Sequence, residues 1–217
     1  MSDTIAFDPS CRRCSRLSAF LDHVRLAQPS YFAAPVPSFG DPAARLLVVG
    51  LAPGMHGANR TGRPFTGDHA GILLYATLHE TGFSNQPEGT DPNDGLQLRD
   101  CRITNAVRCL PPANKPMPEE VRACNDFLAH ELTGNPAPQV ILALGQIAHQ
   151  AVLMAAALRQ RDFPFSHGAL HRLPTGQTLL SSYHCSRYNT QTRRLTPEMF
   201  TAVFRRARHL LDHGQSS

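Results

Sequence analysis

The sequence predicts an α/β fold with a mainly parallel sheet, and three observations support this prediction. Short apolar, partly β-branched runs of the buried-strand type recur along the 217 residues, and helix-like stretches lie between them. Glycine-rich polar segments begin where the apolar runs end. Strands and helices that alternate in this way imply right-handed crossovers, with helices on both faces of the sheet. The expected strands are 45–51, 101–107, 139–145 and 178–184.

The helices are expected around and between these strands. The last of them opens with Thr196-Pro197-Glu198, which is typical of an N-cap and a first turn. The segment 83–99 is rich in Gly, Asn, Asp and Pro and should be a surface loop. The chain is long enough for one well-buried domain and slightly short for two, so we expect a single domain over residues 1–217. The expected helices are 14–28, 70–81, 118–132, 145–159 and 196–212.

The charge pattern favours a polyanionic partner. The formal charge is +4, and 20 of the 21 basic residues are Arg, whose planar guanidinium suits bidentate contacts to phosphate. A GC-rich genome would give the same excess of Arg, so both explanations stay open. No apolar stretch approaches the roughly 18 residues of a membrane helix, and the beginning of the chain lacks the pattern of a signal peptide. Together with the unpaired cysteines, this predicts a cytoplasmic protein without membrane contact.

Four cysteines form the pattern of a metal centre that draws on two distant segments. Cys11 and Cys14 form a C-x2-C pair, whereas Cys109 and Cys124 are separated by fourteen residues that include four prolines. A zinc ribbon would require a second tight pair, and the open spacing suits a bulkier iron-sulfur cluster with all-thiolate ligation better. Ordinary buried thiols are the alternative explanation.

The segment 50–71 carries six glycines and is the most unusual part of the sequence. Glycine lets the backbone approach a ligand closely, and N–H groups are available before a helix near Asp68. The segment has neither the Gly-Lys-Ser/Thr ending of a P-loop nor a dinucleotide-binding fingerprint, which disfavours a nucleotide cofactor. Phe65 is poorly placed for a core residue and well placed to stack on a flat ring. Residues 51–68, 105–116 and 184–195 should form a ligand site at the carboxyl ends of the strands.

Three motifs occur in order with the four cysteines. They are G-L-A-P-G-x-H-G-x-N-R-T-G-R-P-F-T-G-D from Gly50, I-T-N-A-V-R-C from Ile103, and H-C-S-R-Y-N-T-Q-T-R-R-L-T from His184. This combination resembles the family 5 (type B) uracil-DNA glycosylases, which are iron-sulfur members of the uracil-DNA glycosylase superfamily. The resemblance covers nearly the whole chain. The related family 4 enzymes open the first motif with G-E-A-P-G, whereas this chain has Leu51, which favours family 5.

The resemblance implies a three-layer α/β/α fold with a central, mainly parallel four-stranded sheet. It implies that the four cysteines ligate a structural 4Fe-4S cluster. It also implies excision of uracil, and of other deaminated bases such as hypoxanthine and xanthine, from DNA. By motif position, Phe65 would stack on the flipped base, Asn105 would read its pairing edge, and His184 would donate to its O2. The backbone around Gly54 and His56 would line the pocket.

One departure from the family motif lies beside His184, where His-Cys-Ser replaces the usual His-Pro-Ser. The loss of proline predicts a looser DNA-facing loop, and Cys185 is expected as a neighbour of the site. Superfamily members commonly place Asp or Asn just after the first strand, where this chain has Leu51 and Ala52. Asp68 is the nearest acid, and we expect it to position the attacking water. Its alternative role is the N-cap of the helix that follows.

The scarcity of lysine bears on the type of reaction. Bifunctional glycosylases that also cut the strand use an amine to form a Schiff base, and here only Lys115 and the N-terminus could supply one. A monofunctional enzyme that leaves an abasic site is therefore favoured. Three alternatives stay open: a family 4-type enzyme with narrow uracil specificity, a non-catalytic iron-sulfur module that binds nucleic acid, and a small-molecule hydrolase that uses the glycine-rich loop.

The residues that follow His184 are expected to contact DNA. In the superfamily that the chain resembles, the equivalent loop enters the minor groove and helps to hold the base out. The resemblance therefore implies that Arg187 or Tyr188 would fill the space that the flipped base vacates, while Arg193 and Arg194 would contact phosphate. An ordinary solvated basic loop is the alternative, but the position directly after His184 favours the DNA role. We expect a monomer that acts on DNA containing uracil or other deaminated bases.

Overall fold

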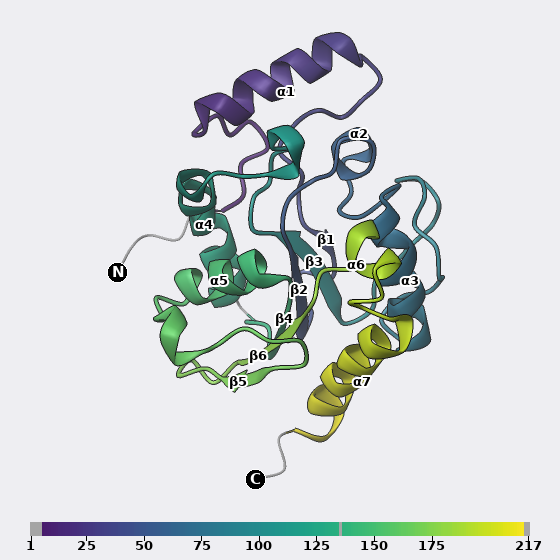
Figure 1. Ribbon diagram of the computed structural model, residues 1–217, viewed down its shortest axis with the longest axis vertical. Helices are drawn as coiled ribbons and strands as arrows, with labels where there is room; N and C mark the ends of the chain where they lie inside the picture. The colour runs from purple at the N-terminus through teal and green to yellow at the C-terminus, as the bar shows by residue number, and fades with distance from the viewer. Residues whose placement is uncertain (1–5, 135, 215–217) are drawn as a thin grey trace.

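A six-stranded sheet runs through the centre of the computed structural model, which describes residues 6–134 and 136–214 (Figure 1). The four central strands are parallel, which confirms the mainly parallel α/β prediction, and a short antiparallel strand extends the sheet at each edge. These edge strands have two and three residues, too few for a periodic sequence signal. In sheet order the strands are β1 (Phe39–Gly40), β3 (Cys101–Asn105), β2 (Leu46–Gly50), β4 (Val140–Leu144), β6 (Thr178–Ser182) and β5 (Leu170–Arg172).

Helices cover both faces of this sheet (Figure 1). One face packs on α3 and α7, and the other packs on α4 and α5, so the fold has three layers. The two shortest α-helices lie in segments where the sequence predicted only loops. The helices are α1 (Ser15–Ala27), α2 (Ala58–Thr61), α3 (His69–Glu80), α4 (Pro118–Thr133), α5 (Gln146–Ala155), α6 (Arg187–Gln191) and α7 (Pro197–His213), with 3-10 turns η1 (Pro112–Asn114) and η2 (Gln160–Asp162).

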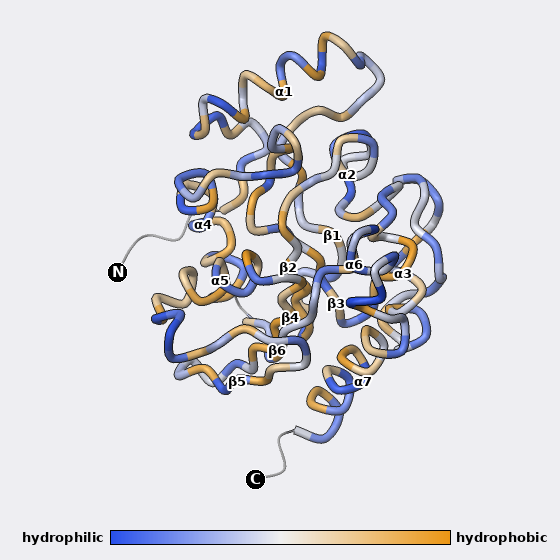
Figure 2. Tube along the Cα trace, in the orientation of Figure 1, coloured by the Kyte–Doolittle hydropathy of each residue, from blue (hydrophilic) through white to orange (hydrophobic). Residues whose placement is uncertain are grey.

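The central strands are apolar on both sides because each side contacts a helical layer. Every residue of β2 is buried; Leu46 and Val48 join the core beneath α3 and α7, while Leu47 and Val49 join the core beneath α4 and α5. Figure 2 shows this as hydrophobic colour along the central strands and as alternating colours along α7. Continuous apolar strands of this kind are typical of parallel sheets that are buried on both faces.

The carboxyl ends of the parallel strands lie together at one edge of the sheet. Gly50 at the end of β2 pairs with Asn105 at the end of β3, and Leu144 of β4 pairs with Ser182 of β6. The segments that leave these strands therefore start side by side, which is the arrangement that forms ligand sites in open parallel sheets. No helix in the described ranges is long and apolar enough to cross a membrane.

The segment 83–99, predicted as a surface loop, forms a loop whose two ends are paired with each other. Ser84 and Leu98 form an isolated antiparallel bridge at its base, so the intervening residues make a closed loop that we call the 84–98 loop. Gly67 donates its N–H to the carbonyl of Gly89 over 3.2 Å. The 84–98 loop is thereby connected to the glycine-rich segment that precedes α3.

Candidate active site

A pocket of about 450 Å³ lies at the carboxyl ends of β2, β3 and β6. It brings together six of the residues that the sequence analysis selected, and it adds His69, Asn114 and Ser186, which lie in those segments but had no distinctive pattern. Its lining consists of Leu51, Ala52, Gly54, Phe65, Asp68, His69, Ala70, Asn105, Asn114, His184, Ser186 and Arg187.

Phe65 and His184 form the aromatic part of this pocket. Their rings are nearly parallel, with an interplanar angle of 27° and centroids 6.2 Å apart. Phe65 has a left-handed backbone with φ of 59°, which is uncommon for a residue with a side chain. Gly50 is necessary here, since a Cβ on it would lie 2.7 Å from Cζ of Phe65 and 2.4 Å from Oδ1 of Asn105. The end of β2 must therefore lack a side chain for these groups to meet.

Asn105 presents a buried amide at the end of β3. Its residue exposure is 3 %, and its Oδ1 has no hydrogen-bond partner among the described residues. A buried polar atom without a partner costs about 1–3 kcal/mol, so such atoms in native proteins call for an explanation. A ligand with a donor group in this pocket would satisfy the amide oxygen.

His184 follows β6 and is neutral in this environment. Burial lowers its pKa to about 4, so the imidazole carries one N–H donor and one acceptor nitrogen at neutral pH. The side chain of Asn189 donates to the His184 carbonyl over 2.7 Å, which fixes the backbone. Gly145, with φ of 98°, leaves room for the imidazole, because a Cβ on it would lie 3.3 Å from Cβ of His184.

Asp68 occupies the position before α3, but its side chain does not cap that helix. Instead, the N–H of Ala58 at the start of α2 donates to Oδ2 of Asp68 over 3.2 Å. Gly54 and Gly57 make this possible, since a Cβ on Gly57 would lie 2.0 Å from Oδ1 of Asp68. Burial raises the pKa of the carboxyl. The alternative role as the side-chain N-cap of α3 is therefore wrong, and the carboxylate borders the pocket.

Two residues near the site, His56 and Cys185, lie outside the pocket lining. His56 is exposed, and its Nδ1 lies 2.8 Å from the hydroxyl of Tyr31, so it does not belong to the pocket lining. Cys185 is fully buried in the core beneath α3 and α7, which also contains Phe65, and it adjoins His184 without lining the pocket. Burial, with a smaller contribution from Asp68, raises the pKa of this thiol to about 12. The thiol is thus protonated and packed as an apolar side chain.

The four residues proposed to contact DNA lie in α6 or just after it. Arg187 lines the pocket itself, and Tyr188 has an exposed fraction of 70 %. Arg193 has a left-handed backbone with φ of 57° and borders a neighbouring groove beside α3. The guanidinium of Arg194 lies over the ring of Tyr183, 4.6 Å from its centroid. A basic and aromatic surface therefore adjoins the pocket mouth.

The four cysteines with the metal-centre pattern line one small pocket between the N-terminal arm and α4. All four are free thiols, and the backbone N–H of Arg108 donates to Sγ of Cys124 over 3.3 Å. Burial, and then the neighbouring cysteines, raise the pKa of Cys109 to about 12. In the described part of the chain, no three Cys, His, Asp or Glu side chains are grouped so as to hold a single metal ion.

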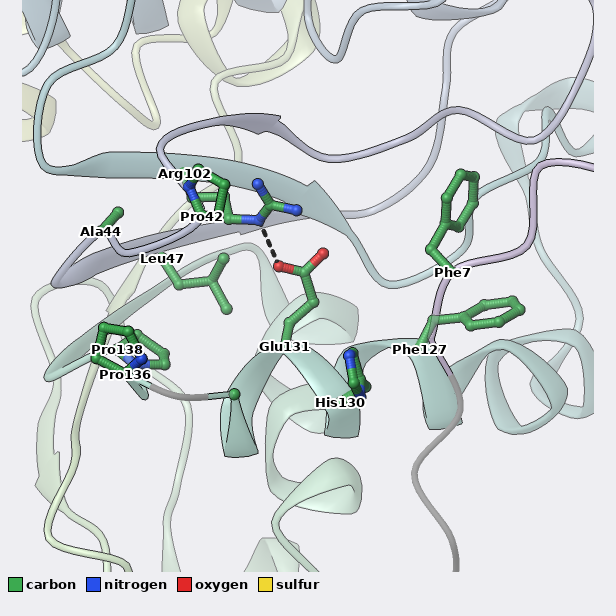
Figure 3. A pocket seen from close by; sticks show the side chains of 11 residues that line it. Phe7, Pro42, Ala44, Leu47, Arg102, Phe127, His130, Glu131, Pro136 and Pro138 are labelled. Atoms are coloured by element: carbon green, nitrogen blue, oxygen red, sulfur yellow. Dashed lines mark hydrogen bonds and ion pairs between the residues drawn. The ribbon is translucent and has the colours of Figure 1, made fainter.

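A separate cavity of about 250 Å³ lies near the beginnings of β2, β3 and β4 (Figure 3). Its acidic residue, Glu131, is already paired with Arg102 over 2.7 Å and with Arg108 over 3.0 Å. Figure 3 shows Arg102 and Glu131 facing each other, with Phe7 and Phe127 to one side. The two charged residues that line this cavity, Arg102 and Glu131, are thus already paired with each other.

The fold and the pocket define an α/β protein with a flat, aromatic and amide-lined binding site at the carboxyl edge of a parallel sheet. The family model of the Uracil DNA glycosylase superfamily matches residues 37–208. The chain therefore belongs to the uracil-DNA glycosylase superfamily and, by its relatives, to its type-5 family.

Relatives named as type-5 and as type-4 uracil-DNA glycosylases support the assignment to the superfamily. The chain is 52 % identical over 206 residues to a type-5 uracil-DNA glycosylase of Thermus thermophilus, covering 93 % of this chain and 94 % of the relative. It is 44 % identical to a type-5 uracil-DNA glycosylase of Mycobacterium leprae, covering 92 % and 91 %. A type-4 uracil-DNA glycosylase of Archaeoglobus fulgidus is 33 % identical over 153 residues, covering 70 % and 63 %. The similarity is thus higher and more complete to the type-5 proteins.

Proposed function

We propose that this protein is a monofunctional uracil-DNA glycosylase. It hydrolyses the N-glycosidic bond of uracil in DNA, and of hypoxanthine and xanthine as further deaminated bases, and leaves an abasic site for base excision repair. The observation that carries this proposal is the pocket in which the unpaired amide of Asn105 lies beside Phe65 and a neutral His184. The membership of the type-5 family agrees with it.

Recognition requires the base to leave the duplex. A base inside the helix cannot be attacked in place, so it is flipped out at a cost of a few kcal/mol, which is lower for mispaired deaminated bases. Phe65 then stacks on the ring, and stacking on an aromatic side chain is worth about 1–3 kcal/mol per base. The Asn105 amide carries an acceptor and a donor group, which suit the N3–H and O4 of uracil. The flipped uracil thus supplies the donor that Oδ1 of Asn105 lacks.

His184 acts on the charge that develops during bond cleavage. Breaking the glycosidic bond leaves an oxocarbenium-like sugar and a base that carries negative charge. The neutral imidazole donates one N–H to O2 of the base, and this hydrogen bond strengthens as the charge grows. Because burial holds the pKa of His184 near 4, the donor stays a neutral imidazole throughout the physiological pH range.

Asp68 is our choice for positioning the attacking water. One carboxylate oxygen accepts from the N–H of Ala58, and Asp68 also borders the base pocket. The other oxygen is then available to hold a water near the sugar. A carboxylate in this place also favours the oxocarbenium-like sugar electrostatically.

The four free cysteines fit a 4Fe-4S cluster. They are four thiols around one pocket with an otherwise largely apolar lining, which matches all-thiolate ligation. Cys11, Cys14, Cys109 and Cys124 would hold the cluster. When bound, it supplies covalent cross-links between the N-terminal arm and the region of α4, so its role is structural. Ligation requires the thiols to lose their protons, which couples cluster insertion to pH.

The surface around α6 is proposed to hold the DNA. Arg187 or Tyr188 occupies the space left by the flipped base, and Arg193 and Arg194 contact phosphates. The exposure of Tyr188 and the position of Arg187 at the pocket support these roles. We further propose that residues 1–217 form a single domain that acts as a cytoplasmic monomer.

Base release from defined oligonucleotides tests this function. The purified protein is incubated with duplexes that contain one uracil, hypoxanthine or xanthine, and abasic sites are detected as breaks after alkali. We expect release of uracil, with breaks appearing only after the alkali step. The absence of release from all three duplexes would overturn the proposal. Strand breaks without alkali, together with a borohydride-trapped adduct, would overturn its monofunctional part.

A further inference from the structure

The left-handed backbone of Phe65 is held by a buried network that the proposed reaction does not use. A non-glycine residue in this conformation is commonly stabilised by its surroundings, at a cost of about 1–3 kcal/mol. Gly71 allows the close packing, because a Cβ on it would lie 2.0 Å from the carbonyl oxygen of Phe65. The position of the Phe65 ring, which faces His184, therefore depends on residues outside the pocket.

The hydroxyl of Tyr75 connects the residues on both sides of Phe65. It donates to the carbonyl of Pro64 and lies 3.3 Å from Oγ1 of Thr66. Since the hydroxyl proton is used on Pro64, Thr66 must be the donor to the Tyr75 oxygen. Tyr75 and Thr66 are both fully buried, so bulk water does not compete for these hydrogen bonds.

The chain of contacts continues to the 84–98 loop. Nε of Arg63 donates to Oγ1 of Thr66 over 2.6 Å, and the guanidinium forms a bidentate pair with Asp94 over 2.9 and 2.7 Å. Asp94 also accepts backbone N–H groups of its own loop, from Thr90 over 3.0 Å and from Leu96 over 3.0 Å. The side chains of Arg63 and Asp94 are 6 % and 14 % exposed, so the pair is poorly screened by solvent.

We propose that Tyr75, Arg63 and Asp94 are positioning residues that hold the Phe65 ring in its stacking orientation. This inference rests on the proposed function only in taking Phe65 as the residue that stacks on the base. The 84–98 loop thereby sets the affinity for the flipped base, although no residue of that loop lines the base pocket. The network acts through Phe65 and has no contact with the reacting atoms.

The test measures binding of free uracil, which is the released product, separately from catalysis. Tyr75→Phe removes only the buried hydroxyl, and Asp94→Asn keeps the shape of the side chain but breaks the charged bidentate pair. Asp100→Asn is the matched control, because Asp100 forms an ion pair with Arg45 over 2.5 Å outside the base pocket. The dissociation constant of uracil is obtained by ligand-observed NMR, and excision is measured under single-turnover conditions.

We expect Tyr75→Phe and Asp94→Asn each to weaken uracil binding by about tenfold. This loss is only a part of what stacking one base on an aromatic ring contributes to binding. The excision rate at saturating enzyme should fall less than the rate at limiting enzyme. In a Phe65→Ala background neither change should weaken binding further, because the network acts through that ring. Asp100→Asn should lower the melting temperature without changing uracil affinity.

Unchanged uracil affinity in a folded Tyr75→Phe protein would overturn the inference. So would equal weakening with and without the Phe65 ring, which would indicate a general loss of stability. A wild-type protein that releases no base would instead refute the proposed function. The two failures are therefore distinguishable, and Tyr75→Phe serves if Asp94→Asn does not fold.

Discussion

Replacing His184 with alanine should slow base excision far more than it weakens DNA binding. The imidazole lies in the base pocket, almost parallel to Phe65, and burial keeps it neutral. If its N–H donates to O2 of the departing base, the interaction is stronger in the transition state than in the bound substrate. The variant therefore loses stabilisation where charge develops and little of the ground-state binding.

The size of this effect follows from the environment of the donor. Removal of one donor from a buried site that stabilises a developing negative charge costs about 3–4 kcal/mol, which is about 10²–10³-fold in rate. In the proposed function, duplex DNA is held by phosphate contacts around α6 and by stacking against Phe65, both of which the variant would retain. The dissociation constant for DNA should therefore change by less than about threefold, which is a small part of the binding free energy that one phosphate or stacking contact contributes.

The assay uses single-turnover excision from a uracil-containing duplex, with enzyme in excess, and binding to a duplex that carries a non-hydrolysable uracil nucleotide. His167→Ala is the matched control, since burial also lowers the pKa of His167 but its ring packs against Tyr183 outside the base pocket. Equal losses in rate and in binding would refute the reasoning. They would show that His184 contributes uniformly to binding and has no specific role as charge develops.

The remaining predictions concern the metal centre, the carboxylate, the DNA surface and pH. Purified protein should be yellow-brown, and Cys109→Ala should lose colour and melting temperature together; stoichiometric zinc without iron would contradict this. Gly57→Ala should slow excision by about 10²-fold, because its Cβ would displace the Asp68 carboxylate, and an unchanged rate would remove Asp68 from the mechanism. Arg193→Ala with Arg194→Ala should reduce the magnitude of the salt slope of DNA binding by up to about two units, and an unchanged slope would exclude phosphate contacts. The excision rate should show no titration near pH 6.5, since the pKa of His184 is about 4. The contribution of neutral His184 to the free energy of unfolding, present above the ordinary histidine pKa, should be lost as the pH falls towards 4.

The four parallel strands could be predicted because both faces of each are covered by helices, which leaves continuous apolar runs in the sequence. Strands β1 and β5 could not, because their pairing depends on neighbours that are distant in the chain. Ser186 is the N-cap of helix α6, and its hydroxyl accepts from the N–H of Asn189, but a single cap before five residues is a weak local signal.

The candidate site was predictable where a residue lies at the end of a strand or shortly after it, as Asn105 and His184 do. The site was not predictable where a side chain has several possible hydrogen-bond partners. Asp68 precedes α3 in the manner of an N-cap, yet its carboxylate accepts from the N–H of Ala58 in α2, where Gly54 and Gly57 leave room for it. The pair of Arg63 and Asp94 joins two loops, and the sequence carries no periodic pattern that would connect them.

The buried thiol of Cys185 makes it an internal reporter of motion next to His184. Alkylating reagents attack the thiolate, and this thiol is both inaccessible and protonated at neutral pH. Labelling therefore requires the segment between β6 and α6 to open transiently, and its rate measures the free energy of that opening. Mass spectrometry of labelled peptides, with and without DNA, would show how far the substrate closes this part of the enzyme.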